Sequence, residues 1–371
     1  MADSKFREKK LCFFFSEHNS LNDGALRPFI NWAIELSTHG YEISILLLNS
    51  EAKLNFDSKV NNIKSKHVKS YKEIINYLNI TRPDILISDD QFARLRLITK
   101  IKSKLQIKTC IYVQILFGFH IIADALNTSY LPVKRKLQIH FLRYGFFNFF
   151  KRWYKEMLQK HDLIITNSEI STTLLNIIYN TECDDVVYPP IDSSIFKDEN
   201  LKKNNQVLVY AGRSTGDTDE SFVRKILVCL RNKECKIFIL GNRIMQEKLS
   251  REFNIQKLSD INDEVLAQIY SESLLTICPQ KWETFGYVVA ESIFCGTPVL
   301  TFNCMGAAEI IAQTTGGYLA NNKKDFLKKL EHFNLENFNL ETLRKTRSTY
   351  PYDISYSTRK LMNRIQMSWG S

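Results

Sequence analysis

Two glutamates, separated by seven intervening residues, lie in the part of the chain best suited to bind a ligand. Glu283 lies on a polar loop after an apolar run, and Glu291 lies in a helical segment that starts near Tyr287. The amides from Thr284 to Tyr287 form the start of that helix, where phosphate binds favourably, and Gly286 lets a ligand approach the backbone. A carboxylate in the helix can accept two hydrogen bonds from a ribose diol, and one on the loop can contact a sugar. The pattern predicts a site for a phosphorylated sugar compound; the alternative is a surface loop with two solvated carboxylates.

The elements that position this segment are short apolar runs that alternate with amphipathic stretches. Strands are expected at residues 11–15, 41–48, 84–88, 109–113, 162–166, 207–211, 236–240, 274–278 and 298–302, and early helices at 25–38, 72–78 and 93–104. The alternation occurs once before Tyr188-Pro-Pro and again after it, which predicts two doubly wound parallel sheets and an α/β fold. Ligands of such sheets bind beyond the carboxyl ends of the strands.

Composition narrows the class of protein. With 371 residues, of which 44% are hydrophobic, the chain is long enough for two domains with a core each. Its eight cysteines show no C-x-x-C or metal-ligand spacing, which favours reduced thiols and no structural zinc. The charged start is unlike a signal peptide, and the longest apolar stretch, 110–126, is too interrupted to span a membrane. We expect a cytoplasmic protein, at most peripheral at the cytoplasmic membrane face.

Several further motifs share their order and spacing with one family. They are Glu283-x-Phe-Gly with Glu291, Cys295-Gly-Thr-Pro-Val, Gly306-x-x-Glu309 and Gly317-Tyr-Leu, preceded by Asn167-Ser-Glu169, Tyr188-Pro-Pro-Ile-Asp192 and Tyr210-Ala-Gly-Arg213. In these motifs the chain resembles the retaining glycosyltransferases of GT-B fold, family four, also called glycosyl transferases group 1. The resemblance covers the second half of the chain densely and the first half thinly.

The resemblance implies a GT-B architecture, in which two doubly wound Rossmann-like domains face each other across a cleft. Residues 1–192 would bind the acceptor, residues 193–350 would bind the nucleotide sugar, and residues 351–371 would form a helix that crosses back to the first domain. The implied reaction moves a hexose from a nucleotide-diphosphate sugar to a saccharide or lipid-linked acceptor with retention of configuration. The donor is a substrate, and neither a cofactor nor a metal ion is expected.

The resemblance also implies roles for single residues. Glu291 would hold the ribose, Glu283 would lie at the sugar, and Arg213 would neutralise the diphosphate. The amides of Phe285 to Tyr287 would meet sugar hydroxyls and the distal phosphate. The expected donor contacts are therefore Gly24, Arg213, Glu283, Thr284, Phe285, Gly286, Tyr287 and Glu291, and the expected catalytic residues are Glu283 and Arg213 with His120 and Gln114.

Two departures from the family pattern lie in the first half. The family's glycine-rich turn after the first strand has a second glycine before Gly24, where this chain has Asp23. The family's histidine after the fourth strand is replaced by Gln114, and His120 follows six residues later. Gln114 can hydrogen-bond a sugar hydroxyl but cannot carry a proton. His120 is either a second candidate for the site or a core histidine.

A third departure lies after Arg213, where the family has a lysine five or six residues on. This chain has acids there, at Asp217, Asp219 and Glu220. Asp217 and Asp219 match a D-x-D metal motif, but an acidic N-cap for a helix that starts near Ser221 is the favoured interpretation. Arg224 or Lys225 would then turn inward to replace the lysine, or the donor would be bound less tightly.

The basic surplus, a net charge of +10, concentrates at residues 134–160, where eight Lys or Arg accompany one acid, Glu156. Interleaved aromatics suit an anionic membrane surface; the alternative is a domain helix with core aromatics and solvated charges. Two other functions stay open, a GT-B-like protein that binds sugar nucleotides without transfer and a basic nucleic-acid-binding protein. Because no nucleic-acid-binding motif accompanies the charge, we expect no nucleic-acid partner.

Overall fold

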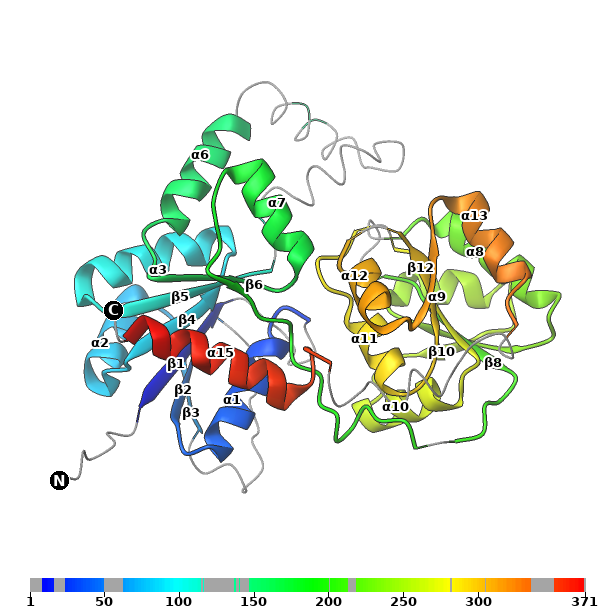
Figure 1. Ribbon diagram of the computed structural model, residues 1–371, viewed down its shortest axis with the longest axis horizontal. Helices are drawn as coiled ribbons and strands as arrows, with labels where there is room; N and C mark the ends of the chain where they lie inside the picture. The colour runs from blue at the N-terminus through cyan, green and yellow to red at the C-terminus, as the bar shows by residue number, and fades with distance from the viewer. Residues whose placement is uncertain are drawn as a thin grey trace. The chain divides into compact units, whose positions relative to one another are not determined.

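The computed structural model describes two compact units (Figure 1). The described residues are 9–16, 24–49, 63–114, 116, 137, 140, 147–199, 201–212, 218–280, 282–303, 305–334 and 350–369. The first unit holds the described residues up to 116, those from 140 to Pro190 and those from Ile354 onward, and the second holds Leu137 and the described part of Ile191–Asp353. The chain therefore changes unit after Pro190 and again after Asp353, where the sequence suggested divisions after residues 192 and 350.

The first unit is a seven-stranded parallel sheet with the strand order β3-β2-β1-β4-β5-β6-β7. Its strands are β1 (Lys10–Ser16), β2 (Glu42–Leu48), β3 (Ile63–Val68), β4 (Ile85–Asp89), β5 (Lys108–Val113), β6 (Leu163–Thr166) and β7 (Asp185–Val186). Its helices are α1 (Arg27–Thr38), α2 (Tyr71–Thr81), α3 (Phe92–Leu105), α6 (Phe147–Leu158), α7 (Glu169–Tyr179) and α15 (Ile354–Trp369). Leu11 to Phe15 are all fully buried, as expected for a central strand that is covered on both faces.

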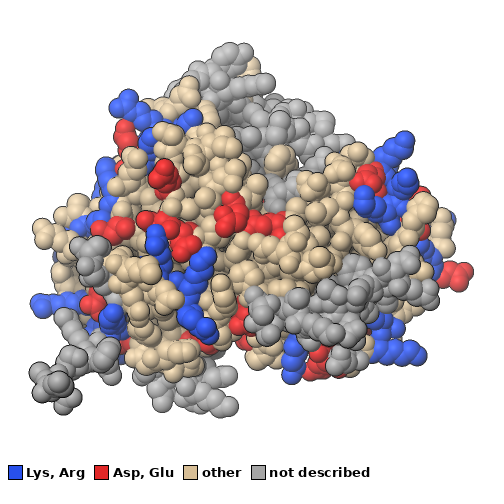
Figure 2. Space-filling view, viewed as in Figure 1, with Lys and Arg blue, Asp and Glu red and all other residues tan. Residues whose placement is uncertain are grey.

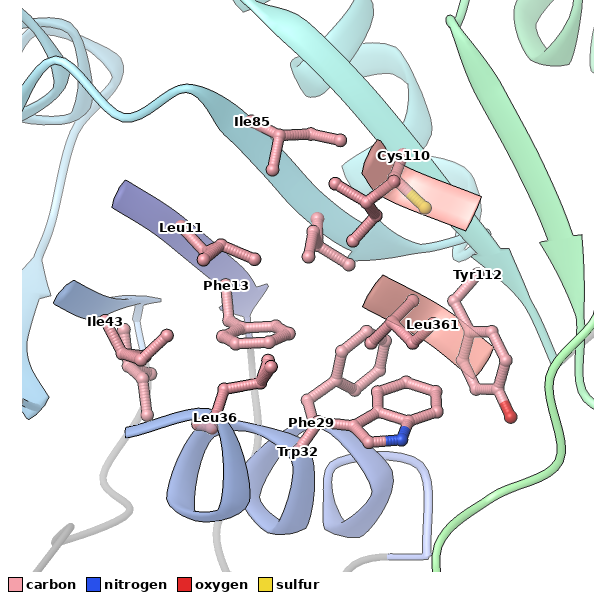
Figure 3. Close-up of a cluster of buried hydrophobic side chains, with 14 of the residues drawn as sticks. Leu11, Phe13, Phe29, Trp32, Leu36, Ile43, Ile85, Cys110, Tyr112 and Leu361 are labelled. Atoms are coloured by element: carbon pink, nitrogen blue, oxygen red, sulfur yellow. The ribbon is translucent and has the colours of Figure 1, made fainter. Parts of the chain in front are cut away.

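One face of this sheet packs on α1 and on the last helix, α15 (Figure 3). Phe29 and Trp32 of α1 contact Tyr112 of β5 edge to face, with ring centroids 5.5 and 4.9 Å apart. Leu361 of α15 belongs to the same buried cluster. The indole nitrogen of Trp32 donates a 2.9 Å hydrogen bond to the Ser357 hydroxyl, which fixes α15 against α1.

The second unit is a six-stranded parallel sheet with the strand order β10-β9-β8-β11-β12-β13. Its strands are β8 (Gln206–Tyr210), β9 (Lys236–Leu240), β10 (Gln256–Leu258), β11 (Leu275–Cys278), β12 (Val299–Phe302) and β13 (Gly317–Ala320). Its helices are α8 (Glu220–Arg231), α9 (Arg243–Ser250), α10 (Asp263–Glu272), α11 (Tyr287–Phe294), α12 (Met305–Thr314) and α13 (Lys323–Glu331). Two Rossmann-like sheets confirm the predicted α/β class.

All nine strands expected from the sequence are present, and the four strands that were not expected are the outer strands of the two sheets. They are β3, β7, β10 and β13. β3 alternates lysines with small and polar residues and leaves most of its side chains exposed, and β7 has only two residues. For β3, β7 and β10 the outer position explains the difference, because an outer strand has one neighbour and little core to cover, and its sequence lacks the apolar run by which inner strands are identified. No helix in the described ranges is long and apolar enough to cross a membrane.

A buried histidine makes the stability of the first unit sensitive to acid. His161 lies between the hydroxyls of Thr99 and Thr109, at 3.2 and 3.0 Å. Burial, with the nearby charge of Lys102, lowers the pKa of His161 from 6.5 to about 3. Below about pH 6.5 the unfolded chain therefore takes up a proton that the folded chain refuses.

We expect this histidine to remove about 2 kcal/mol from the free energy of unfolding between about pH 7 and about pH 5. The sign follows from the lowered pKa: the stability is fully present above the unfolded pKa and is lost as the pH falls below it. Chemical denaturation at both pH values measures the loss. His161→Gln, which does not titrate, should show a smaller loss, and identical pH dependences in the two proteins would contradict the assignment.

Candidate functional site

The two central strands of the second sheet, β8 and β11, meet where the strand order changes direction. They pair in parallel, with Val209 beside Ile277, while β9 and β10 continue on one side and β12 and β13 on the other. The loops after β8 and β11 therefore leave the carboxyl edge of the sheet next to each other. This is the position where doubly wound sheets bind ligands, and it carries the loop with Glu283.

Helix α11 begins directly above this edge without a side-chain cap. Gly286 precedes it with φ +108°, a conformation that favours glycine. The Gly286 carbonyl accepts the first helical hydrogen bonds, from the amides of Val289 and Ala290 at 3.1 and 3.0 Å. A helix start of this kind presents backbone amides and the positive end of the helix dipole to an anion.

Glu291 is buried in the second turn of α11, with 2% of its surface exposed. The hydroxyl of Tyr270, from α10, donates to Glu291 Oε2 at 3.2 Å. Burial and then the charge of Glu291 raise the pKa of Tyr270, so its hydroxyl stays protonated and can donate. The pKa of the buried Cys278 thiol is raised by burial and then by Glu283 and Glu291. Both glutamates singled out from the sequence thus lie near the end of β11.

Close backbone contacts fix the loop that carries Glu283. The Gly306 amide, at the start of α12, donates to the Glu283 carbonyl at 3.0 Å. A Cβ atom on Gly306 would lie 2.3 Å from the Thr284 carbonyl oxygen, so α12 and the loop can approach this closely only with glycine there. The same holds for Gly241, where a Cβ would lie 2.3 Å from the Gly212 oxygen after β8. The glycines in the sequence motifs therefore set the spacing of the loops.

A buried hydroxyl network beneath α11 was not expected from the sequence. The Ser292 hydroxyl donates to the Thr297 carbonyl at 3.0 Å, and its oxygen lies 2.8 Å from Thr276 Oγ1, within hydrogen-bond distance. The Thr297 hydroxyl donates to the Tyr270 carbonyl at 2.5 Å, which ties α10 to the turn after α11. Its signal in the sequence is the Gly-Thr-Pro run after Cys295. At the same edge, the side-chain oxygen of Gln280 is buried and has no hydrogen-bond partner within the described part of the chain.

The acidic stretch after β8 is described from Thr218 onward. Asp219 caps α8, accepting from the amides of Ser221 and Phe222 at 3.0 and 3.4 Å, which confirms the N-cap interpretation for this residue. Asp219 also forms an ion pair with Lys323 of α13. Burial raises the pKa of Asp219, but hydrogen bonds from Lys323 and Ser221 lower it by more, so the pKa lies below its usual value.

The two cations expected to turn inward do not do so. Arg224 pairs with Glu220 at 2.9 Å and with Glu252, and Lys225 is exposed. Arg213 and Asp217 lie outside the described residues. Within the described ranges, no group of three or more His, Cys, Asp or Glu side chains could hold a metal ion.

In the first unit, Gln114 is engaged with the turn that carries Gly24. Gln114 Nε2 donates to the Ala25 carbonyl at 2.7 Å. The buried carboxylate of Asp90 accepts from the amides of Gln114 and Leu116, at 3.0 and 2.7 Å, and from the Tyr154 hydroxyl at 2.8 Å. Gln114 thus positions the Gly24 turn, and His120 lies outside the described residues. Asp90 was missed; its signal was a pair of aspartates directly after a buried strand.

Residues 192–348 match the family model described as Glycosyl transferases group 1. The second unit therefore carries a domain of this type, which includes both glutamates and the loops around them. A glycosyltransferase of Haemophilus influenzae is 25% identical over 342 residues, which cover 87% of this chain and 90% of that protein.

Solved structures of glycosyltransferases share the fold over nearly the whole chain, which confirms the predicted GT-B type of fold. A glycosyltransferase of Rickettsia africae has a TM-score of 0.72 at 15% identity, covering 98% of this chain and 99% of that one. Anabaena Alr3699/HepE, solved with UDP and glucose, has a TM-score of 0.68 at 13% identity, covering 96% and 99%. WaaG, a glycosyltransferase of lipopolysaccharide biosynthesis, has a TM-score of 0.64 at 16% identity, covering 94% and 98%.

Gln114→Glu tests the positioning role, because it keeps the shape of the side chain and removes its amide donor. We expect the free energy of unfolding to fall by about 1–3 kcal/mol, since the Ala25 carbonyl loses its partner beside the buried Asp90. Chemical denaturation measures the change. Gln159→Glu, at an exposed position of the same unit, should change stability by less than about 0.5 kcal/mol. Equal stability of both variants would show that the Gln114 hydrogen bond does not hold the turn.

Proposed function

We propose that this protein transfers a hexose from a nucleotide-diphosphate sugar to a saccharide or lipid-linked acceptor, with retention of configuration at the sugar. The second unit would bind the donor, and the first unit would bind most of the acceptor, near the turn that carries Gly24. The proposed reaction uses no cofactor and no metal ion. The protein would act in the cytoplasm, at the cytoplasmic face of the membrane when its acceptor is lipid-linked.

The observation that carries the proposal is the buried Glu291 carboxylate beneath the start of α11, which is 2% exposed. The two oxygens of a carboxylate can accept about four hydrogen bonds, so Glu291 can accept from Tyr270, at 3.2 Å, and from both hydroxyls of a ribose diol. The diphosphate of the same ligand would then lie at the uncapped start of α11, with Arg213 as its expected cation. The side-chain oxygen of Gln280, which has no partner among the described residues, adds an acceptor for a ligand hydroxyl.

The chemical step needs stabilisation of two charges. As the bond between the anomeric carbon and the phosphate oxygen breaks, negative charge grows on the diphosphate and positive charge on the sugar ring. The amides at the start of α11 would stabilise the negative charge on the diphosphate, and the carboxylate of Glu283 would stabilise the positive charge on the sugar ring. The acceptor hydroxyl would attack on the face that the diphosphate leaves and would pass its proton to the departing phosphate.

Similar proteins support this assignment. Alr3699/HepE, which shares the fold, was solved with UDP and glucose, and the names of several relatives describe glycosyl transfer. The nucleic-acid alternative has less support. On the face seen in Figure 2, basic and acidic side chains are interspersed, whereas a nucleic-acid interface gathers basic residues in one patch.

The roles of the two glutamates can be separated by isosteric changes. A panel of UDP-, GDP- and ADP-sugars, tested by saturation-transfer NMR, would first identify the donor. Glu291→Gln should then weaken nucleotide binding about tenfold or more, because a neutral amide is a weaker partner for the ribose diol. Glu283→Gln should bind the nucleotide nearly as tightly and lose about 100-fold in turnover.

The control for both changes is Glu264→Gln, on the exposed side of α10. It should match the unchanged protein in donor affinity and in rate. Equal losses of donor affinity in the Glu283 and Glu291 variants would contradict the division of roles, and binding of no sugar nucleotide would overturn the proposed function.

A membrane-bound acceptor would be reached through helix α6, the described part of the basic segment. Phe150 and Trp153 pack on Phe92 of α3, with ring centroids 6.0 and 4.2 Å away, so part of the aromatic pattern is packing. Phe149 is 64% exposed, and Lys151, Arg152 and Lys155 follow on the same helix. An exposed aromatic beside several cations suits the surface of a bilayer that contains anionic lipids.

Sedimentation with anionic liposomes tests this contact. Neutralising Lys151, Arg152 and Lys155 together should lower partitioning by roughly 100-fold, at about 1 kcal/mol for each charge, and added salt should lower it further. A control variant neutralises three exposed lysines of the same unit: Lys66, Lys69 and Lys72. Equal loss in both triple variants would show that only the net charge matters, and no retention of the unchanged protein would indicate a water-soluble acceptor.

A further inference from the structure

A cavity of about 550 Å³ opens at the carboxyl edge of the second sheet, and none of the roles above uses it. It lies between the loops that follow β11, β12 and β13. Six of its lining residues carry recognition chemistry: Trp282, Asn303, Asn321, Asn322, Lys323 and Lys324. Because Trp282 directly precedes Glu283, this cavity adjoins the loop to which we assign the transferred sugar.

The side chains of the cavity combine an indole with three amides. Asn303 donates to Asn321 Oδ1 at 3.1 Å, and Asn322 Oδ1 caps α13 by accepting from the Asp325 amide at 3.0 Å. The Nδ2 groups of Asn321 and Asn322 make no hydrogen bond to any described residue, and all three asparagines are exposed. A sugar ring offers hydroxyls to amides and an apolar face to an aromatic ring, so this combination suits a saccharide.

The charges around the cavity leave one cation unbalanced. Lys323 is paired with Asp219, and Asp325 is paired with Lys329 at 2.7 Å. Lys324 is exposed and forms no ion pair with a described residue. The local field is therefore positive, at the start of a helix whose dipole adds to it. An anion is the ligand group that this field favours.

We propose that the cavity binds an acidic sugar, a saccharide that carries a phosphate or a carboxylate, with Lys324 at the anionic group. The proposal rests on the proposed function, because the neighbouring Glu283 loop is assigned there to the transferred sugar. The acidic sugar is either the hexose of the donor or a residue of the acceptor. In both cases the cavity selects substrates by the charge on the sugar.

The first experiment needs neither nucleotide nor activity. Saturation-transfer NMR titrations with glucose, glucose 6-phosphate and glucuronate should show the two charged sugars binding about tenfold more tightly than glucose, the size of one exposed charge-assisted hydrogen bond. Lys324→Gln should remove this preference. Lys328→Gln, an equal change of charge one turn later on the exposed side of α13, should retain it. Equal binding of glucose and glucuronate, or an unchanged preference in Lys324→Gln, would overturn the proposal.

The second experiment identifies the source of the acidic sugar. If it belongs to the donor, Lys324→Gln weakens UDP-glucuronate about tenfold and leaves UDP-glucose unchanged, and UDP-glucuronate displaces glucuronate. If it belongs to the acceptor, glucuronate stays bound at saturating UDP-glucuronate. Failure of the proposed function has a different signature: sugar nucleotides do not bind, while Lys324-dependent binding of glucuronate persists. Nucleotide binding that needs Glu291, with no dependence on Lys324 for any charged sugar, would refute the cavity assignment alone.

Discussion

The hydrogen bond from Tyr270 to the buried carboxylate of Glu291 is the interaction on which the arrangement of the second unit depends. Removing a carboxylate from water costs several kcal/mol unless donors replace the lost hydration. Tyr270 is one such donor, and it is held because Thr297 binds its carbonyl at 2.5 Å. Thr297 in turn is fixed to Ser292 on α11 itself. The helix with the carboxylate and the helix with its partner are thus locked to each other, and the uncapped start of α11 is fixed above β11.

Much of the fold could be predicted because inner strands of parallel sheets need apolar residues on both faces. Leu11 to Phe15 show this directly, and all the strands with such runs were placed correctly from the sequence. Ile63 to Val68 form an outer strand with a single neighbour and keep Lys64 and Lys66 in solvent. This strand forms because it pairs with β2. The pairing depends on the assembled sheet, so the local sequence of the strand does not indicate it.

The candidate site could be predicted where its residues are close in sequence, and much less where they are not. Glu283, Gly286 and Glu291 share one loop and helix, so their spacing already placed them together. Gln114 and Ala25 are 89 residues apart, and Asp219 and Lys323 are 104 residues apart. Only tertiary packing brings those pairs into contact. This is why Gln114 was considered for its chemistry alone, and why replacement of the missing lysine was sought in the neighbouring Arg224 and Lys225.

The path of the chain has a consequence for how the protein is made. The main part of the second unit begins at Ile191 and ends at Asp353, and these two ends lie side by side, since the Ile191 amide donates to the Tyr352 carbonyl at 2.7 Å. The second unit is thus an insertion with adjoining ends, complete before α15 is synthesised. The first unit begins earlier on the ribosome yet finishes later, because Leu361, Met362 and Ile365 complete its core. Until then the apolar face of α1 around Trp32 lacks its cover, and a chain stalled after the second unit would expose that surface to chaperones and proteases.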